Sequence, residues 1–178
     1  MTSRSGTGHK IRTPGSLKRI RARLRREGKR VVFTNGCFDL IHGGHIHLFR
    51  WAKKQGDVLL VALNTDASVR RLKGPTRPVF PLAERMEVLA AIADIDYLVS
   101  FGEDTPRRLI AELLPDVLVK GGDWGPGEIV GAEEVEAAGG RVVRVPYLKG
   151  HSSTDLIEKI LRDFGQKGDG SIFRKKMP

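Results

Sequence analysis

Five short apolar runs of strand length alternate with helical patterns along this chain of 178 residues. The clearest run is Val58–Leu63, and the others are Arg30–Thr34, Tyr97–Phe101, Asp116–Val119 and Arg141–Val145. Continuous apolar runs are typical of strands buried on both faces, and helices between such strands are typical of parallel sheets. The sequence therefore predicts an α/β fold with a Rossmann-like, doubly wound, five-stranded parallel sheet.

Helical patterns fill the spaces between these strands. They cover Leu82–Ala93, Thr105–Leu114 and about Glu133–Ala138, and further helices open near His45, at Asp66 and after His151. Sheets of this kind bind ligands beside the carboxyl ends of their strands, near the point where the strand order reverses. Functional residues are therefore expected in the loops that follow the strands.

The segment Gly36–His45 follows the first strand and places two imidazoles around the glycine pair Gly43 and Gly44. The unpaired N–H groups and positive dipole end of the helix behind it attract anions, and glycines allow a ligand to approach the backbone. His42 and His45 would add side-chain hydrogen bonds to phosphate oxygens. The segment therefore predicts a phosphate site.

Two other interpretations of this segment are open. The first is a glycine turn whose histidines are hydrogen-bonded within the protein. The second is a zinc site formed by Cys37, His42, His45 and His47, since thiolate and imidazole suit that metal. The chain has only one cysteine and no Cys-x-x-Cys motif, so we expect no resident metal.

The net charge of +10 is carried by the ends of the chain. Residues 1–30 hold eleven Lys or Arg against one Glu, whereas residues 31–161 hold fifteen against eighteen acidic residues. Leu17, Ile20 and Leu24 form an apolar stripe, so residues 14–28 are expected to pack on the domain as a helix with a solvated basic face. Binding of RNA, anionic lipid or an acidic partner to that face is the alternative.

The length suits one domain, which we place at residues 14–164. Residues 1–13 and 165–178, rich in Gly, Ser, Lys and Arg, are predicted to be disordered basic tails. No apolar run approaches the roughly 20 residues of a membrane span, and the N-terminus lacks the apolar region of a signal peptide. We therefore expect a cytoplasmic protein. A homo-oligomer is compatible with the sequence.

Three later loops carry polar or glycine residues that would lie at the same edge of the sheet as the predicted phosphate site. Asn64, Asp66 and Lys73 follow the second strand, and Lys73 precedes Gly74 in a stretch able to reach over a triphosphate. Gly121, Gly122 and Asp123 follow the fourth strand, where the carboxylate could accept from a hydroxyl. Ser152, Ser153 and Thr154 open the last helix, and three hydroxyls are more than an N-cap needs.

The Gly-x-Phe-Asp-x-x-His-x-Gly-His pattern of residues 36–45 resembles the signature of the nucleotidyltransferase superfamily, and Ser152–Thr154 resembles its second signature. Tyr147 stands where glycerol-3-phosphate cytidylyltransferases have Arg, which makes a cytidylyltransferase a weaker interpretation. The sequence of about residues 14–161 resembles that of the adenylyltransferases of ADP-heptose synthesis. The segments that carry this likeness include Phe33–Asp39, Asn64–Ser68, Arg71–Gly74, Glu84–Met86 and Val119–Asp123.

The resemblance implies transfer of AMP from ATP to D-glycero-β-D-manno-heptose 1-phosphate, giving ADP-heptose for lipopolysaccharide core and releasing pyrophosphate. A cytidylyltransferase, an adenylyltransferase for another phosphorylated small molecule, and a nucleotide- or RNA-binding protein are the alternatives. Mg²⁺ would arrive on ATP, held mainly by phosphate oxygens and water.

A sugar phosphate is already a nucleophile at pH 7, so the enzyme has to position the reactants and neutralise charge. We expect catalytic contacts from His42, His45 and Lys73. Substrate contacts are expected from Asn64, Asp66 and Arg85. Nucleotide contacts are expected from Gly36, Cys37, Phe38, Asp39, Gly43, Gly44, Gly121, Gly122, Asp123, Ser152, Ser153 and Thr154.

Overall fold

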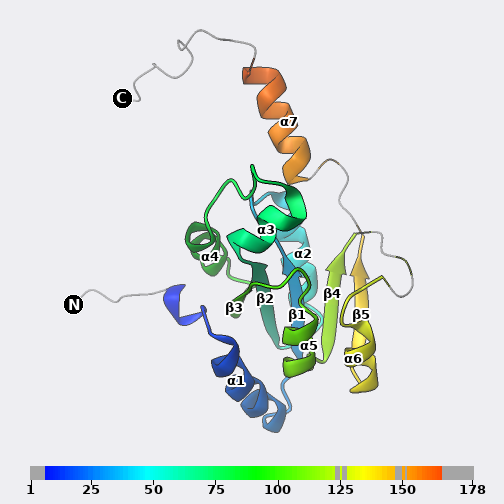
Figure 1. Cartoon of the computed structure of the whole chain (residues 1–178). Helices are drawn as coiled ribbons and strands as arrows, with labels where there is room; N and C mark the ends of the chain where they lie inside the picture. The colour runs from blue at the N-terminus through cyan, green and yellow to red at the C-terminus, as the bar shows by residue number, and fades with distance from the viewer. Residues whose placement is uncertain (1–6, 123–124, 126–127, 147–149, 151, 166–178) are drawn as a thin grey trace, which may run out of the picture.

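A five-stranded parallel sheet forms the centre of the computed structural model, which describes residues 7–122, 125, 128–146, 150 and 152–165 (Figure 1). Its strand order is β3-β2-β1-β4-β5, and every pairing is parallel. The strands are β1 (Val31–Gly36), β2 (Val58–Asn64), β3 (Tyr97–Phe101), β4 (Val117–Gly121) and β5 (Arg141–Val145). The predicted fold class and all five predicted strands are confirmed.

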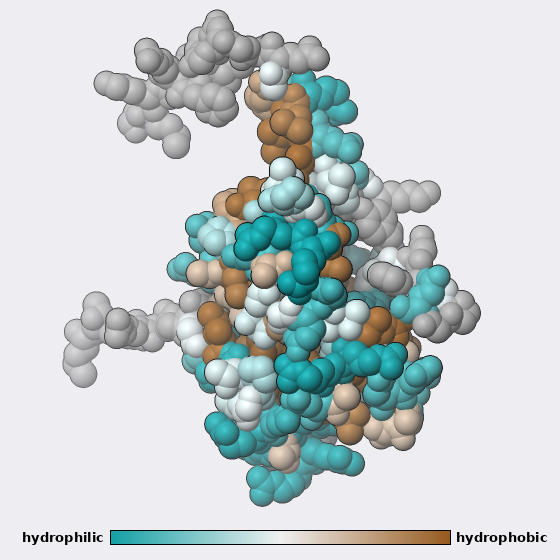
Figure 2. Space-filling model, viewed as in Figure 1, coloured by the Kyte–Doolittle hydropathy of each residue, from teal (hydrophilic) through white to brown (hydrophobic). Residues whose placement is uncertain are grey.

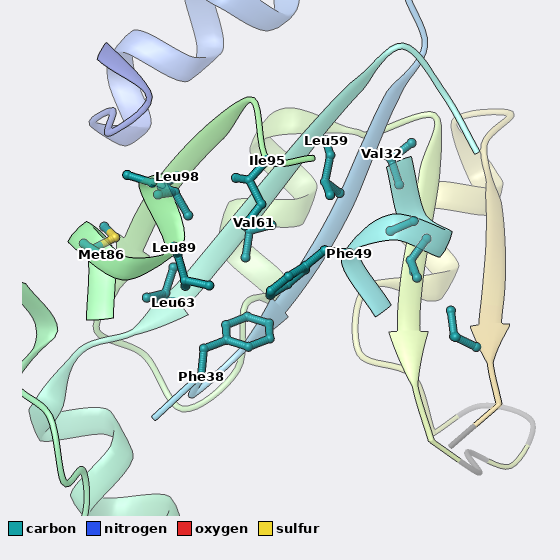
Figure 3. Close-up of a cluster of buried hydrophobic side chains, with 14 of the residues drawn as sticks. Val32, Phe38, Phe49, Leu59, Val61, Leu63, Met86, Leu89, Ile95 and Leu98 are labelled. Atoms are coloured by element: carbon teal, nitrogen blue, oxygen red, sulfur yellow. The ribbon is translucent and has the colours of Figure 1, made fainter. Parts of the chain in front are cut away.

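Helices cover both faces of this sheet and bury two apolar cores. On one face pack α2 (Gly43–Lys53) and α4 (Leu82–Ala90), whose Phe49 and Leu89 meet the strand residues shown in Figure 3. On the other face pack α1 (Pro14–Arg26), α5 (Arg107–Leu113) and α6 (Ala132–Ala137). The continuous apolar runs of the strands are thus explained, because their side chains are buried in both directions.

The strand order reverses at β1, since β2 lies on one side of it and β4 on the other. The chain leaves β1 and β4 at the same edge of the sheet. Two further helices stand at this edge, α3 (Asp66–Lys73) and α7 (Ser153–Phe164) (Figure 1). A ligand site is expected where such a reversal occurs.

The N-terminal helix packs by its apolar stripe as predicted, with Leu17 and Leu24 buried. The predicted disorder of the whole segment 1–13 is wrong for residues 7–13. Thr7–His9 form a short 3-10 helix, and Ile11 bridges to Leu98 of β3. The backbone of Lys10 and Arg12 forms two hydrogen bonds with Leu98, which cover the free edge of that strand.

Several helix boundaries differ by a few residues from the predicted ones; the helix predicted over Thr105–Leu114, for example, covers Arg107–Leu113. The helix after β1 begins at Gly43 rather than near His45, because extended His42 is its N-cap residue and its carbonyl accepts from His45. The helix from Leu82 ends at Ala90, not Ala93. The predicted C-terminal tail lies, apart from Gly165, outside the described residues.

The last helix, α7, projects from the edge of the sheet that carries the site (Figure 1). It has an apolar face that is exposed at Leu156, Ile160, Leu161 and Phe164, and this face forms the brown stripe of Figure 2. None of the helices in the described part of the chain is long and apolar enough to cross a membrane.

Candidate active site

A cavity of about 560 Å³ opens at the edge of the sheet where the strand order reverses. The loop after β1, the start of α2, the ends of β2, β4 and β5, and the first turn of α7 all contribute to its wall. Its volume lies within the range usual for small-molecule sites. Predicted residues that line it are Gly36, Cys37, Phe38, Asp39, His42, Gly44, His45, Asn64, Lys73, Gly121, Gly122, Ser152, Ser153 and Thr154.

The loop after β1 turns sharply so that its glycine and histidines face this cavity. Phe38 has a left-handed φ of +45°, and its ring folds back over Gly36. A Cβ atom at Gly36 would lie 3.0 Å from the Phe38 ring. Glycine at position 36 therefore lets the buried Phe38 fill the space beneath the loop.

The two histidines are stacked at the N-terminus of α2, with ring centroids 3.8 Å apart. The edge of Phe38 packs against His45, at a centroid distance of 5.3 Å. Burial, together with a smaller charge repulsion from His42, lowers the pKa of His45 from 6.5 to about 4. His45 is therefore neutral near pH 7 and can act there only by hydrogen bonding.

Positive charge in the cavity comes from lysine and arginine instead. Lys73 lies at the end of α3, Arg77 in the loop that follows α3, and Lys120 near the end of β4; all three line the cavity. Burial lowers the pKa of Lys120 to about 8, an effect opposed by Cys37. Lys120 thus remains mostly protonated at pH 7, and three cations can face a phosphate chain.

The only cysteine has a thiol whose pKa is raised by burial, although Lys73, Arg85 and Arg77 oppose this effect. A thiol with a raised pKa is a poor nucleophile at neutral pH. Within the described residues, no three side chains of His, Cys, Asp or Glu come together as a metal site. The zinc alternative at Cys37, His42, His45 and His47 therefore gains no support.

Arg85 does not line the cavity, contrary to its predicted substrate contact. Its side chain is fully buried, and its guanidinium donates to the carbonyl oxygens of Cys37, Asn64 and Phe80 over 2.5–3.1 Å. It also forms an ion pair of 2.7 Å with Asp66, which likewise does not line the cavity. The sequence alone does not show whether an arginine in a helix contacts a ligand or is buried within the protein. Here Arg85 is buried and connects several loops.

Asp39 is a second buried group that joins segments of the site. Its carboxylate accepts from Arg77 Nε at 2.6 Å and from the amides of Val79 and Phe80 at 2.8 and 3.1 Å. Its side chain is 1% exposed, so these bonds occupy a group that we expected to contact nucleotide. Asp39 therefore fixes the loop between α3 and α4 against the loop after β1, and holds Arg77 at the cavity wall.

Two of the three hydroxyl groups at the start of α7 form hydrogen bonds within the protein. Ser152 is the N-cap and accepts from the amide of Asp155 at 3.0 Å. Ser153 donates to the carbonyl oxygen of Leu40 at 3.1 Å, which ties this helix to the loop after β1. Thr154 also lines the cavity. The first turn of α7 thus presents its N–H groups and hydroxyls to the same space as the histidines.

The remaining predicted residues have mixed outcomes. Gly43 lies in the first turn of α2 but outside the cavity wall. Asp123 and Tyr147 lie outside the described residues. Sequence reasoning missed Asn35 and Lys120, which line the cavity from neighbouring strands. Their position at the carboxyl ends of apolar strand runs was the signal that could have found them.

Comparison with known proteins gives one family and several close relatives. A family model described as cytidylyltransferase-like matches residues 33–159. The bifunctional protein HldE of Citrobacter koseri is 52% identical over 160 residues, which are 90% of this chain and 34% of that protein. HldE of Pasteurella multocida is 51% identical over 88% of this chain and 33% of its own length. The chain spans about a third of the curated relatives that it matches.

Two solved structures resemble the fold. A lipopolysaccharide core biosynthesis protein from Thermoplasma volcanium is 28% identical, with a TM-score of 0.56, over 70% of this chain and all of that chain. A pantoate–β-alanine ligase from Francisella tularensis, solved with an ATP analogue and β-alanine, is 16% identical with a TM-score of 0.55. It covers 85% of this chain and 78% of its own, and it supports the fold alone.

The role of Arg85 in holding the site together can be tested with Arg85→Met, which removes the guanidinium and keeps the length of the side chain. Three carbonyl groups and the Asp66 carboxylate lose a donor inside the protein, so we expect the free energy of unfolding to fall by about 2–5 kcal/mol. Urea unfolding measures it. The control is Arg108→Met, since the Arg108 side chain is 66% exposed. A loss of under about 1 kcal/mol in Arg85→Met would contradict this role.

The neutral state of His45 has a consequence for stability against pH. Between its ordinary pKa of 6.5 and about 4, the unfolded chain takes up a proton at this position that the folded protein does not. Stability contributed by His45 is therefore lost as the pH falls from 6.5 to 4. We expect His45→Asn to reduce the difference in unfolding free energy between pH 7 and pH 5, and exposed His47→Asn to leave it unchanged. Titration of the His45 ring near pH 6.5 by NMR would refute the burial argument.

Proposed function

Because this chain belongs to the cytidylyltransferase-like family, we propose that it is a nucleotidyltransferase that transfers AMP from ATP to D-glycero-β-D-manno-heptose 1-phosphate. The products are ADP-heptose, a precursor of lipopolysaccharide core, and pyrophosphate. The heptose assignment is supported by the motifs between Phe33 and Asp123 and by identities of 51–52% to the HldE proteins. The Thermoplasma relative, by its description a lipopolysaccharide core biosynthesis protein, agrees with it.

One observation supports nucleotidyl transfer more than any other: two helix N-termini and the cations meet in a single cavity. The stacked histidines stand at the start of α2 and the hydroxyl run at the start of α7, and Lys73 and Lys120 line the same cavity. Helix N-termini and lysines both stabilise phosphate oxygens. A chain of three phosphates is the ligand that this combination fits best.

The reaction needs no base in the protein. An oxygen of the sugar 1-phosphate attacks the α-phosphorus of ATP, a new P–O–P bond forms, and the bond to the β-phosphate breaks to release pyrophosphate. The nucleophile is already ionised at pH 7, so catalysis consists of alignment and stabilisation of charge in the transition state. The raised pKa of Cys37 agrees with direct transfer, since no protein nucleophile is then required.

We assign the residues as follows. His42 and neutral His45 donate hydrogen bonds to the α-phosphate and its transition state, and the first turn of α7 with Lys73 holds the leaving pyrophosphate. The glycines at 121 and 122, with Asp123, line the nucleotide, and Asn64 contacts one of the two ligands. Arg85, Asp66 and Asp39 act as positioning residues, because their polar groups are bonded inside the protein.

Mg²⁺ would enter the cavity bound to ATP and would not be held beforehand by ligands from the protein. The carboxylates in the cavity wall are each held by a neighbour: Asp39 by Arg77, Asp104 by Arg71, and Glu128 by the amide of Gly125. Phosphate oxygens and water supply most ligands of Mg²⁺ in nucleotide sites. The ion would shield charge on the triphosphate, while the protein groups align it. The proposal places the reaction in the cytoplasm, where ATP is available.

The test is pyrophosphate release measured with ATP, CTP, GTP and UTP, each with and without heptose 1-phosphate. We expect kcat/KM for ATP with heptose 1-phosphate to exceed that for CTP with glycerol 3-phosphate by at least about 10³, as buried hydrogen bonds select a ligand. Preference for CTP, or equal use of glycerol 3-phosphate, would leave a nucleotidyltransferase and refute the heptose assignment. No release with any nucleotide, together with RNA binding, would instead favour a binding protein.

A further inference from the structure

A second hollow lies at the opposite end of the sheet from the cavity, where β1, β4 and β5 begin. Its volume is about 410 Å³. The end of α1 with its following turn, the approach to β4, and the turn between α6 and β5 meet around it. Five of the side chains that line it are cations: Arg21, Arg25, Lys29, Arg30 and Arg141.

Acidic groups compensate only part of this charge. Asp116 is the one carboxylate among the described lining residues, and it accepts from Arg21 Nη2 at 2.9 Å and from the amide of Val31 at 2.7 Å. Outside the hollow, Asp57 lies 3.6 Å from Lys29 Nζ. Two cations of the lining, Arg21 and Lys29, thus have a carboxylate partner.

The other three cations have none in the described part of the chain. Arg141 donates to the neutral side chain of Gln55 at 3.1 Å. The side chains of Arg25 and Arg30 form no ion pair or hydrogen bond with any described residue. None of these three guanidinium groups forms an ion pair with a described residue, although the Asp57 carboxylate attracts Arg30 at longer range. The five cations thus face two carboxylates, which leaves a positive local field in the concave space.

The frame that carries these arginines is rigid. Leu17 and Leu24 bury α1 in the core, and Arg21 ties it to the end of α5 by donating to the carbonyl oxygens of Leu113 and Leu114. Arg25 lies four residues after Arg21 and so projects from the same side of the helix. The space itself stays open in part because Gly28 and Gly139 contribute no side chains to it, and a Cβ atom at either position would meet nothing within 4 Å.

The lining also decides the kind of ligand. Among the described lining residues there is no aromatic side chain on which a base could stack, and Val117 is the one large apolar member. Guanidinium groups bind phosphate oxygens in pairs of parallel hydrogen bonds. We propose that this hollow is a binding site for a compact polyphosphate anion, separate from the candidate active site. The site is independent of the proposed function, since no residue of the cavity takes part in it.

The test is calorimetric titration of the full chain with sodium tripolyphosphate in about 0.15 M salt, which screens weak surface attraction. The variant Arg25→Ala/Arg141→Ala should weaken binding by at least about tenfold, since two charge-assisted contacts are lost. The matched control, Arg19→Ala/Arg26→Ala, removes two exposed arginines of α1 that do not line the hollow. It should stay within about twofold of the unmodified chain. Circular dichroism checks that each variant is folded.

Tripolyphosphate could also enter the active-site cavity, so Lys73→Ala is titrated alongside. Binding that is lost in Lys73→Ala and retained in Arg25→Ala/Arg141→Ala would overturn the proposal, as would binding weaker than about 1 mM by the unmodified chain. A single-stranded oligouridine of about twelve nucleotides gives the remaining arm. The compact site is refuted if the oligouridine binds more tightly than tripolyphosphate and if Arg19→Ala/Arg26→Ala weakens oligouridine binding as much as Arg25→Ala/Arg141→Ala does. The basic face would then be an extended nucleic-acid surface.

Discussion

The buried guanidinium of Arg85 joins four segments of the candidate active site at one point. It reaches the loop after β1 through Cys37, the end of β2 through Asn64, the start of α3 through Asp66, and the entry to α4 through Phe80. A buried cation is costly unless every donor finds an acceptor, so these segments have to stay in register. The same segments carry the histidines and Lys73, and the geometry of the cavity depends on this one side chain.

The cavity separates positive charge from hydrogen-bond donation. His45 is held neutral by burial, while Lys73, Arg77 and Lys120 supply the charge from other elements. Asp39 balances Arg77 inside the wall. A site built in this way can bind a highly charged phosphate chain with its cations and still offer neutral donors where the reacting phosphorus lies. Between pH 6 and 8, His45 then stays uncharged, and Lys120, whose pKa is about 8, begins to lose its proton toward the upper end of that range.

The sequence predicted the sheet, its strands and half of the described residues that line the cavity, because apolar runs and glycine-rich loops depend on local pattern. It could not distinguish Arg85 from a ligand contact, since the partners of that guanidinium are mostly backbone carbonyls that a sequence does not reveal. Lys10–Arg12 were assigned to a tail for a similar reason: their bonds to Leu98 use backbone atoms alone. Asn35 and Lys120 were missed because their meeting requires the pairing of β1 with β4, which are far apart in the chain.

The central claim is that this cavity transfers the nucleotidyl group and not the terminal phosphate. It is tested most directly by supplying ATP labelled either at the α- or at the γ-phosphate, with heptose 1-phosphate as acceptor, and separating the sugar product from pyrophosphate. The account predicts that the α-label appears in the sugar product and the γ-label in pyrophosphate. Transfer of the γ-label to the sugar, or an α-labelled product that forms equally well without the sugar, would contradict it.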